Sequence, residues 1–228
     1  MKIGGIIPFT LVDYPGKPAA VVFAAGCNLR CPFCHNPELV TGSGELDTAE
    51  VLAFLETRQG KLQGVCISGG EPTLYPGLVE FITQVKDLGF QVKLDTNGTS
   101  PQVLEELLGK GLLDYVAMDV KSSLEKYELA CGKKVDPEKV VESVELLRSW
   151  EISYELRTTA VPGLVELSDL SSLGKWLGRV PKYVLQQFRP AKTLDPKLST
   201  VKPYDAAWFN EAVKLAHGWA DEVMVRGA

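Results

Sequence analysis

The sequence predicts one α/β domain built on a parallel sheet, because strand patterns and helix patterns alternate along the chain. The expected strands are short runs rich in Val, Ile, Leu and Tyr, at 20–24, 64–68, 91–95, 115–119, 154–158, 183–188 and 222–226. The stretches between them carry helix-capping residues, and polar motifs follow the strand ends. Six or so such units form either an open, doubly wound sheet or a partial barrel.

Start and stop signals delimit the predicted helices. One helix is predicted from Asp47 or Thr48 to Gly60, a second from Pro76 to Gly89, and a third from Asp136 to about Trp150. Two further helices are predicted to start at Ser168 and Asp205. Pro137 occupies the first position after its cap, where the missing N–H costs nothing. We find no repeat, low-complexity tract or linker, so residues 1–228 are predicted to form a single domain.

Composition excludes several classes of protein. The chain is 45% hydrophobic and 23% charged with a net charge of −5, which argues against a broad surface for nucleic acid. It contains no apolar run of about 18 residues and no signal peptide, so we expect a cytoplasmic protein without a membrane span.

Three of the five cysteines, Cys27, Cys31 and Cys34, lie within eight positions of one another. In a reducing compartment this grouping indicates metal or redox chemistry rather than a disulfide framework. One short loop can wrap three corners of a [4Fe–4S] cluster. A cluster held entirely by protein uses four cysteines, so three leave one iron open to a substrate.

Other interpretations of the three cysteines stay open at this point. Structural zinc needs a fourth ligand, which His35, Cys66 or Cys131 would have to supply. The pair Cys31 and Cys34 also fits a C-x-x-C thiol–disulfide enzyme, although the chain is about twice the size of such a module. The residues could finally be structural core cysteines, as is expected of Cys66 and Cys131.

Polar clusters follow three later strands: Ser68-Gly69-Gly70-Glu71-Pro72, Asp95-Thr96-Asn97-Gly98 and Asp119-Val120-Lys121. The carboxyl ends of parallel strands meet at one edge of a sheet, so these clusters and the cysteines are predicted to share one site.

The cysteine pattern followed by the Gly-Gly-Glu-Pro run resembles the radical S-adenosylmethionine superfamily. The stretches Asp13-Tyr14-Pro15-Gly16 and Cys34-His35-Asn36-Pro37-Glu38 are similar to the activating proteins of anaerobic ribonucleoside-triphosphate reductase. That branch is close to the pyruvate formate-lyase activating enzymes. The resemblance implies a partial (β/α)6 TIM-type barrel with parallel strands.

The resemblance also implies roles for the motif residues. Cys27, Cys31 and Cys34 hold the cluster, and S-adenosylmethionine chelates its open iron. Gly69 and Gly70 allow a close backbone approach, and Glu71 suits the methionine ammonium; alternatively this run is only a strand-ending turn. Lys121 would pair with the methionine carboxylate and Asp119 with the ammonium or ribose. Asn97 belongs to the same ligand-binding set.

A monovalent cation, Na⁺ or K⁺, is also implied beside the ligand, held by Asp95, Thr96, Met118 and Asp119 through oxygen atoms that include a backbone carbonyl. On this interpretation, omitting both cations slows catalysis.

Arg157 either contacts the ligand or forms a salt bridge at the edge of the core. Gln186, Gln187 and Arg189 stand where related enzymes reach the ribose, but a histidine that the formate-lyase activators use there is missing.

The implied reaction is reductive cleavage of S-adenosylmethionine to a 5′-deoxyadenosyl radical, with flavodoxin or ferredoxin as the electron donor. The radical takes hydrogen from a glycine of anaerobic ribonucleotide reductase or a related glycyl radical enzyme. Only seven residues separate Cys34 from Gly42, which leaves no room for a ferredoxin-like insert and favours the reductase and formate-lyase types. Two alternatives remain: a radical enzyme acting on a small molecule, such as a deazapurine synthase, and a non-catalytic iron–sulfur electron carrier.

Overall fold

The computed structural model describes residues 2–42 and 44–227, in which eight strands form one sheet in the order β1 to β8. The edge strand β1 (Ile3–Thr10) runs antiparallel to β2 (Ala19–Ala24). The later strands are all parallel: β3 (Gly64–Gly69), β4 (Gln91–Thr96), β5 (Tyr115–Asp119), β6 (Ser153–Ala160), β7 (Val180–Gln187) and β8 (Ala220–Arg226). The parallel α/β sheet confirms the predicted fold class.

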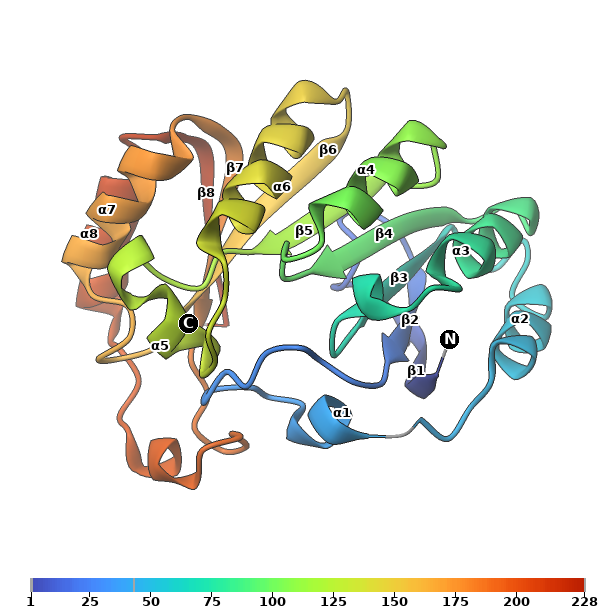
Figure 1. Cartoon of the computed structure of the whole chain (residues 1–228), viewed down its shortest axis with the longest axis horizontal. Coiled ribbons are helices and arrows are strands. Elements are labelled where there is room, and N and C mark those ends of the chain that lie inside the picture. Colours follow the sequence, from blue (N-terminus) through green and yellow to red (C-terminus); the bar gives the residue numbers. More distant parts are fainter. Residues whose placement is uncertain (1, 43, 228) are drawn as a thin grey trace.

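Helices connect the parallel strands (Figure 1). They are α1 (Pro37–Thr41), α2 (Thr48–Glu56), α3 (Leu78–Asp87), α4 (Pro101–Gly109), α5 (Tyr127–Cys131), α6 (Pro137–Ser149), α7 (Leu167–Leu177) and α8 (Ala206–Ala216). The longer helices lie along the outer face of the sheet, whereas α1 and α5 lie at the carboxyl ends of the strands (Figure 1). Short 3-10 turns occur at Pro72–Leu74, Leu124–Lys126 and Pro196–Thr200. Within the described ranges, no helix combines the length and the apolar character that crossing a bilayer requires.

Most predicted helix starts are confirmed. Asp47, Asp136 and Asp205 each cap a helix by accepting a backbone N–H through the carboxylate. The start at Ser168 is wrong, because the preceding Glu166 already caps the helix. Its backbone N–H donates to Asp169 Oδ2 at 2.8 Å, which fixes the first turn.

Two other predicted boundaries are also wrong. Helix α3 begins at Leu78, two residues after the expected Pro76. Helix α2 ends at Glu56, and turns fill the stretch from there to Gly60.

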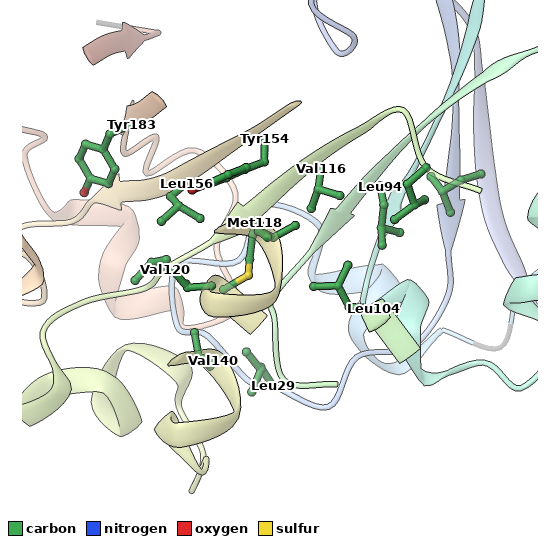
Figure 2. Close-up of a cluster of buried hydrophobic side chains, with 14 of the residues drawn as sticks. Leu29, Leu94, Leu104, Val116, Met118, Val120, Val140, Tyr154, Leu156 and Tyr183 are labelled. Carbon is green, nitrogen blue, oxygen red and sulfur yellow. The ribbon is translucent and has the colours of Figure 1, made fainter. Parts of the chain in front are cut away.

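The outer face of the sheet carries the apolar core. On β5, Val116 and Met118 alternate with residues of the opposite face and pack under the helices. Figure 2 shows them with Leu104 of α4, Val140 of α6 and Leu156 of β6. This layer fixes the positions of the strand ends that carry the polar motifs.

The inner face of the curved sheet is polar and charged, yet it is also buried. Lys93 of β4 is only 2% exposed, and Glu155 of β6 is fully buried. Arg226 of β8 reaches Glu155 of β6 at 3.4 Å, past the intervening strand β7. Paired charges therefore fill the space enclosed by the strands, as expected of a partial barrel.

Candidate active site

The three clustered cysteines lie on the loop that follows β2. Backbone hydrogen bonds fix this loop from two sides: Gly26 N–H donates to Leu39 O at 2.6 Å, and Arg30 N–H donates to Cys131 O at 2.9 Å. Figure 1 shows the loop crossing from β2 toward α5 at the carboxyl ends of the strands. The loop therefore holds its thiols at the mouth of the barrel.

The Gly-Gly-Glu loop after β3 lies directly against the cysteine loop. A Cβ atom at Gly70 would overlap the carbonyl oxygen of Gly26, and Gly69 has a φ of +116°, a conformation that side chains disfavour. Glu71 N–H donates to Gly26 O at 2.9 Å. The two glycines are thus required for the contact between the loops.

The carboxylate of Glu71 turns into the protein. Its side chain accepts hydrogen bonds from the backbone N–H and hydroxyl of Thr73, the hydroxyl of Thr96 and the backbone N–H of Asn97, at 2.6–3.2 Å. Glu71 is 1% exposed. Burial raises the pKa of this carboxyl group, and the four hydrogen bonds oppose that shift. Glu71 therefore connects the loop after β3 to the loop after β4.

Asn97 extends this network to the cysteine loop. Its amide donates to Asn28 Oδ1 at 2.9 Å, while its Oδ1 accepts from the backbone and hydroxyl of Thr99. Asn28 in turn donates to Thr99 at 2.8 Å. The loops after β2, β3 and β4 consequently form one hydrogen-bonded unit.

A chain of alternating charges runs along the inner face toward the mouth. The ammonium of Lys93 pairs with Asp95 Oδ1, and Arg157 bridges Asp95 at 3.3 Å and Asp119 at 2.8 Å. Lys121 pairs with Asp119 at 2.8 Å. The expected salt bridge of Arg157 is thus present, and it joins three strands.

These pairings determine which groups are ionised. Burial opposes ionisation of Asp119, but Arg157 and Lys121 outweigh it and hold its pKa well below the usual range. Burial likewise opposes ionisation of Asp95, yet Arg157 and Lys93 lower its pKa. Burial also disfavours the charged form of Lys121, but the neighbouring Asp119 raises its pKa. The cationic Lys121 lies 6.0 Å from the ring of Phe33, within the cysteine loop.

The thiols of the loop differ in their surroundings. The neighbouring thiol of Cys131 lowers the pKa of Cys31, whereas burial raises that of Cys27 to about 11. Burial also raises the pKa of Cys34. Cys131, which the sequence suggested to be a core residue, is indeed fully buried, but it contacts a predicted cluster ligand.

A cavity of about 430 Å³ opens beside the cysteine loop, at the ends of β6, β7 and β8. Its lining includes His35, Thr159, Gln186, Gln187 and Arg189. The side-chain oxygen of Gln187 is buried without a hydrogen-bond partner among the described residues, while its nitrogen donates to Tyr204 O at 2.9 Å. The sequence-predicted ribose residues therefore line a real cavity.

The residues present fit an iron–sulfur cluster better than a single ion. No three His, Cys, Asp or Glu side chains in residues 2–42 and 44–227 are grouped to hold one metal ion. A cubane cluster binds each thiolate through a different iron, so its ligands need not converge on one point. The three thiols on one tightly held loop are the donor set that such a cluster requires.

The structure also reveals contributors that the sequence interpretation missed. Asn28 and Lys93 were not singled out, and Cys131 was considered only as a core residue or a fourth zinc ligand. A lysine two positions before Asp95 on a buried strand is a signal that could have been used, because both side chains must share one face. No comparable signal marks Cys131, whose approach to Cys31 depends on the tertiary fold.

Fold and site together define a partial-barrel α/β protein that carries three cysteines on one loop at the strand ends. The model of the radical SAM superfamily matches residues 21–168, so this chain belongs to that superfamily. A candidate glycyl-radical enzyme activating enzyme of Methanocaldococcus jannaschii is 34% identical over 229 residues, which cover 98% of this chain and 95% of that protein. The pyruvate formate-lyase-activating enzyme of Listeria monocytogenes is 29% identical over 197 residues, covering 80% and 78% of the two chains.

Solved structures agree on the fold. The crystal structure of Streptococcus suis SuiB bound to the precursor peptide SuiA matches with a TM-score of 0.67 at 12% identity. The match covers 90% of this chain and 48% of that one, so the chain spans about half the length of SuiB.

Proposed function

We propose that this chain is a glycyl radical enzyme activase that cleaves S-adenosylmethionine, with anaerobic ribonucleoside-triphosphate reductase as its first candidate target. The observation that carries the proposal is the placement of three loop thiols beside Asp119 and Lys121 at the barrel mouth. Similarity to a candidate activase along 98% of the chain supports the same function.

Cys27, Cys31 and Cys34 would hold a [4Fe–4S] cluster, leaving one iron for the amino and carboxylate groups of the ligand. When bound, the cluster supplies one electron at low potential. The chain's own residues position the ligand so that this electron has a short path.

Charge and shape suggest how the ligand is held. Lys121 is cationic, 14% exposed and near the cysteine loop, so it suits the methionine carboxylate. Asp119 remains ionised and is 27% exposed, which suits the methionine ammonium or the ribose. The unpaired oxygen of Gln187 suits a ribose hydroxyl in the adjacent cavity.

We assign Glu71 a positioning role instead of a direct contact with the ammonium. Its oxygens are committed to Thr73, Thr96 and Asn97. The backbone of Gly69 and Gly70, which Glu71 fixes, is then the part of the loop that approaches the ligand.

One electron from flavodoxin or ferredoxin reaches the sulfonium and breaks its bond to C5′, releasing methionine and a 5′-deoxyadenosyl radical. That radical takes a hydrogen atom from the α-carbon of a glycine in the partner. The products are 5′-deoxyadenosine and a glycyl radical. The partner must cover the barrel mouth, because water would otherwise enter the site.

Anaerobic reconstitution with iron and sulfide tests the cleavage step. Reduced wild-type protein should bind four irons and form 5′-deoxyadenosine from S-adenosylmethionine, whereas Cys31→Ala should lose both properties. Asn210→Ala, an exposed change on α8, serves as the matched control and should behave as the wild type. A wild-type protein that binds four irons and cleaves nothing would be an electron carrier.

A further inference from the structure

The two carboxylates expected from sequence to bind a monovalent cation are already engaged by other side chains. All four carboxylate oxygens of Asp95 and Asp119 already accept from other groups. Asp95 Oδ1 pairs with Lys93, and its Oδ2 accepts from Ser68 at 3.0 Å and Arg157 at 3.3 Å. The two oxygens of Asp119 accept from Arg157 and Lys121, each at 2.8 Å.

The charge balance of this group also disfavours another cation. Lys93, Arg157 and Lys121 set three positive charges against the two negative charges of Asp95 and Asp119. A further cation would meet three cationic side chains that already neutralise both carboxylates, at distances where repulsion in a buried site is strong.

The side chains of the other two expected residues, Thr96 and Met118, point elsewhere, which leaves only their backbone carbonyls facing the carboxylates as candidate ligands. Successive side chains of a strand face opposite sides of the sheet, so Thr96 cannot share the inner face with Asp95. Its hydroxyl donates to Glu71 Oε1 at 2.7 Å. Met118 is fully buried on the outer face, where Figure 2 shows it among Leu104, Val116 and Val140.

We propose that the ammonium of Lys93 is a built-in replacement for a bound monovalent cation, which makes ligand binding at this site independent of Na⁺ and K⁺. Lys93 is a positioning residue: it holds Asp95, Asp95 helps to hold Arg157, and Arg157 orients Asp119 at the mouth. The inference rests on the proposed function only in that S-adenosylmethionine is taken as the ligand.

Burial makes this role specific to Lys93. The side chain of Lys93 is 2% exposed, and its ammonium pairs with Asp95. The same ammonium lies 3.7 Å from the sulfur of Cys66. Burying the carboxylate of Asp95 costs desolvation free energy. The ammonium of Lys93, which is covalently tethered to the chain, offsets that cost without the binding of an ion from solution. Such a cation is present at every salt concentration.

The wild-type protein provides the first test. The melting temperature of the full, cluster-free chain is measured in NaCl, KCl and tetramethylammonium chloride at equal ionic strength. S-adenosylmethionine cleavage by the reconstituted protein is then measured in the same salts. Neither quantity should distinguish the three salts. Specific stabilisation or activation by Na⁺ or K⁺ would overturn the proposal.

Variants of Lys93 provide the second test. Lys93→Ser leaves room and an oxygen ligand for an ion, so its melting temperature should rise by several degrees when Na⁺ or K⁺ replaces tetramethylammonium. Its cleavage activity should rise about fivefold or more in the same exchange. Lys93→Arg keeps a tethered cation and should stay indifferent to the salt.

Lys86→Ser is the matched control, because it removes a lysine–aspartate pair with Asp114 away from the mouth. It should lose stability equally in all three salts. A salt-indifferent Lys93→Ser would show that Lys93 is only structural. If the variants do not fold, the wild-type comparison decides alone. If the melting temperature of the wild type is the same in all three salts, but neither the wild type nor any variant cleaves S-adenosylmethionine, this inference is supported and the proposed function is refuted.

Discussion

The side-chain amide of Asn97 donates to Oδ1 of Asn28 at 2.9 Å and joins two loops that lie 69 residues apart in the sequence. This contact ties the cysteine loop to the end of β4. Through its backbone N–H, Asn97 also donates to Glu71 at 2.7 Å. One residue thus links three of the loops that form the barrel mouth.

Removing this link should loosen the cysteine loop. Asn97→Ala leaves Asn28, Thr99 and their neighbours with unmet hydrogen bonds, at a cost of about 1–3 kcal/mol in unfolding free energy. We expect the variant to lose iron faster than the wild type after reconstitution, because its ligand loop is less ordered. Urea unfolding and iron release to a chelator measure the two effects, and Asn210→Ala should change neither.

Substitution of Glu71 separates a positioning role from direct ligand binding. Glu71→Gln replaces one acceptor oxygen with an NH₂ donor that faces groups which themselves donate. We expect a loss of about 2 kcal/mol or more in unfolding free energy, even without any ligand. Glu80→Gln on the exposed face of α3 is the control. A Glu71→Gln protein with wild-type stability and weakened S-adenosylmethionine binding would favour the direct contact.

Acid should weaken the contribution of Asp119 to stability. Its native pKa lies below that of the unfolded chain, about 3.9, so the stabilisation is complete above that pH and is lost as the pH falls toward the native pKa. We expect Asp119→Asn to be less stable than the wild type by about 3 kcal/mol at pH 7. The difference should shrink below about pH 4.

Unfolding free energies of both proteins across this pH range check the prediction. The exposed Asp87→Asn controls for general charge effects. A gap between wild type and Asp119→Asn that stays constant down to low pH would show that Asp119 is not held ionised by its neighbours.

Cys131 tests whether the cluster has three or four protein ligands. Its thiol lies near that of Cys31 and lowers the pKa of Cys31, and we expect Cys131→Ala to retain four irons and to cleave S-adenosylmethionine. Hydrogen bonds to cluster sulfurs tune the reduction potential, so the variant should have a more negative potential. Iron analysis and a redox titration followed by electron paramagnetic resonance measure both. Loss of the cluster would identify Cys131 as the fourth ligand and support the electron carrier.

Much of the fold could be predicted because buried parallel strands produce apolar runs, as at Val65–Ile67 of β3. β1 was not predicted, since Gly4, Gly5 and Pro8 interrupt its pattern, and its stability depends on tertiary pairing with β2 and on the bridge from Ile3 to Leu46. Helix α4 was missed although Pro101 stands at its first position.

The polar motifs of the candidate site could be found because each follows a strand, and parallel strands bring their ends together. The direction of each side chain was harder to predict. The sequence suggests that the carboxylate of Glu71 is free to bind the ligand. In the structure, hydrogen-bond donors of the surrounding loops satisfy this carboxylate, so it can be buried. The role of Lys93 depends on the curvature of the sheet, which encloses a face that the sequence pattern alone leaves open to solvent.

The most direct test of the account follows a labelled hydrogen atom. Anaerobic ribonucleotide reductase carrying α-deuterated glycine is incubated with the reduced, reconstituted protein and S-adenosylmethionine, and the 5′-deoxyadenosine is analysed by mass spectrometry. We predict that deuterium appears in 5′-deoxyadenosine while the reductase gains a glycyl radical signal in electron paramagnetic resonance. If 5′-deoxyadenosine forms without deuterium, and neither this reductase nor pyruvate formate-lyase gains a radical, the protein is not an activase of these enzymes.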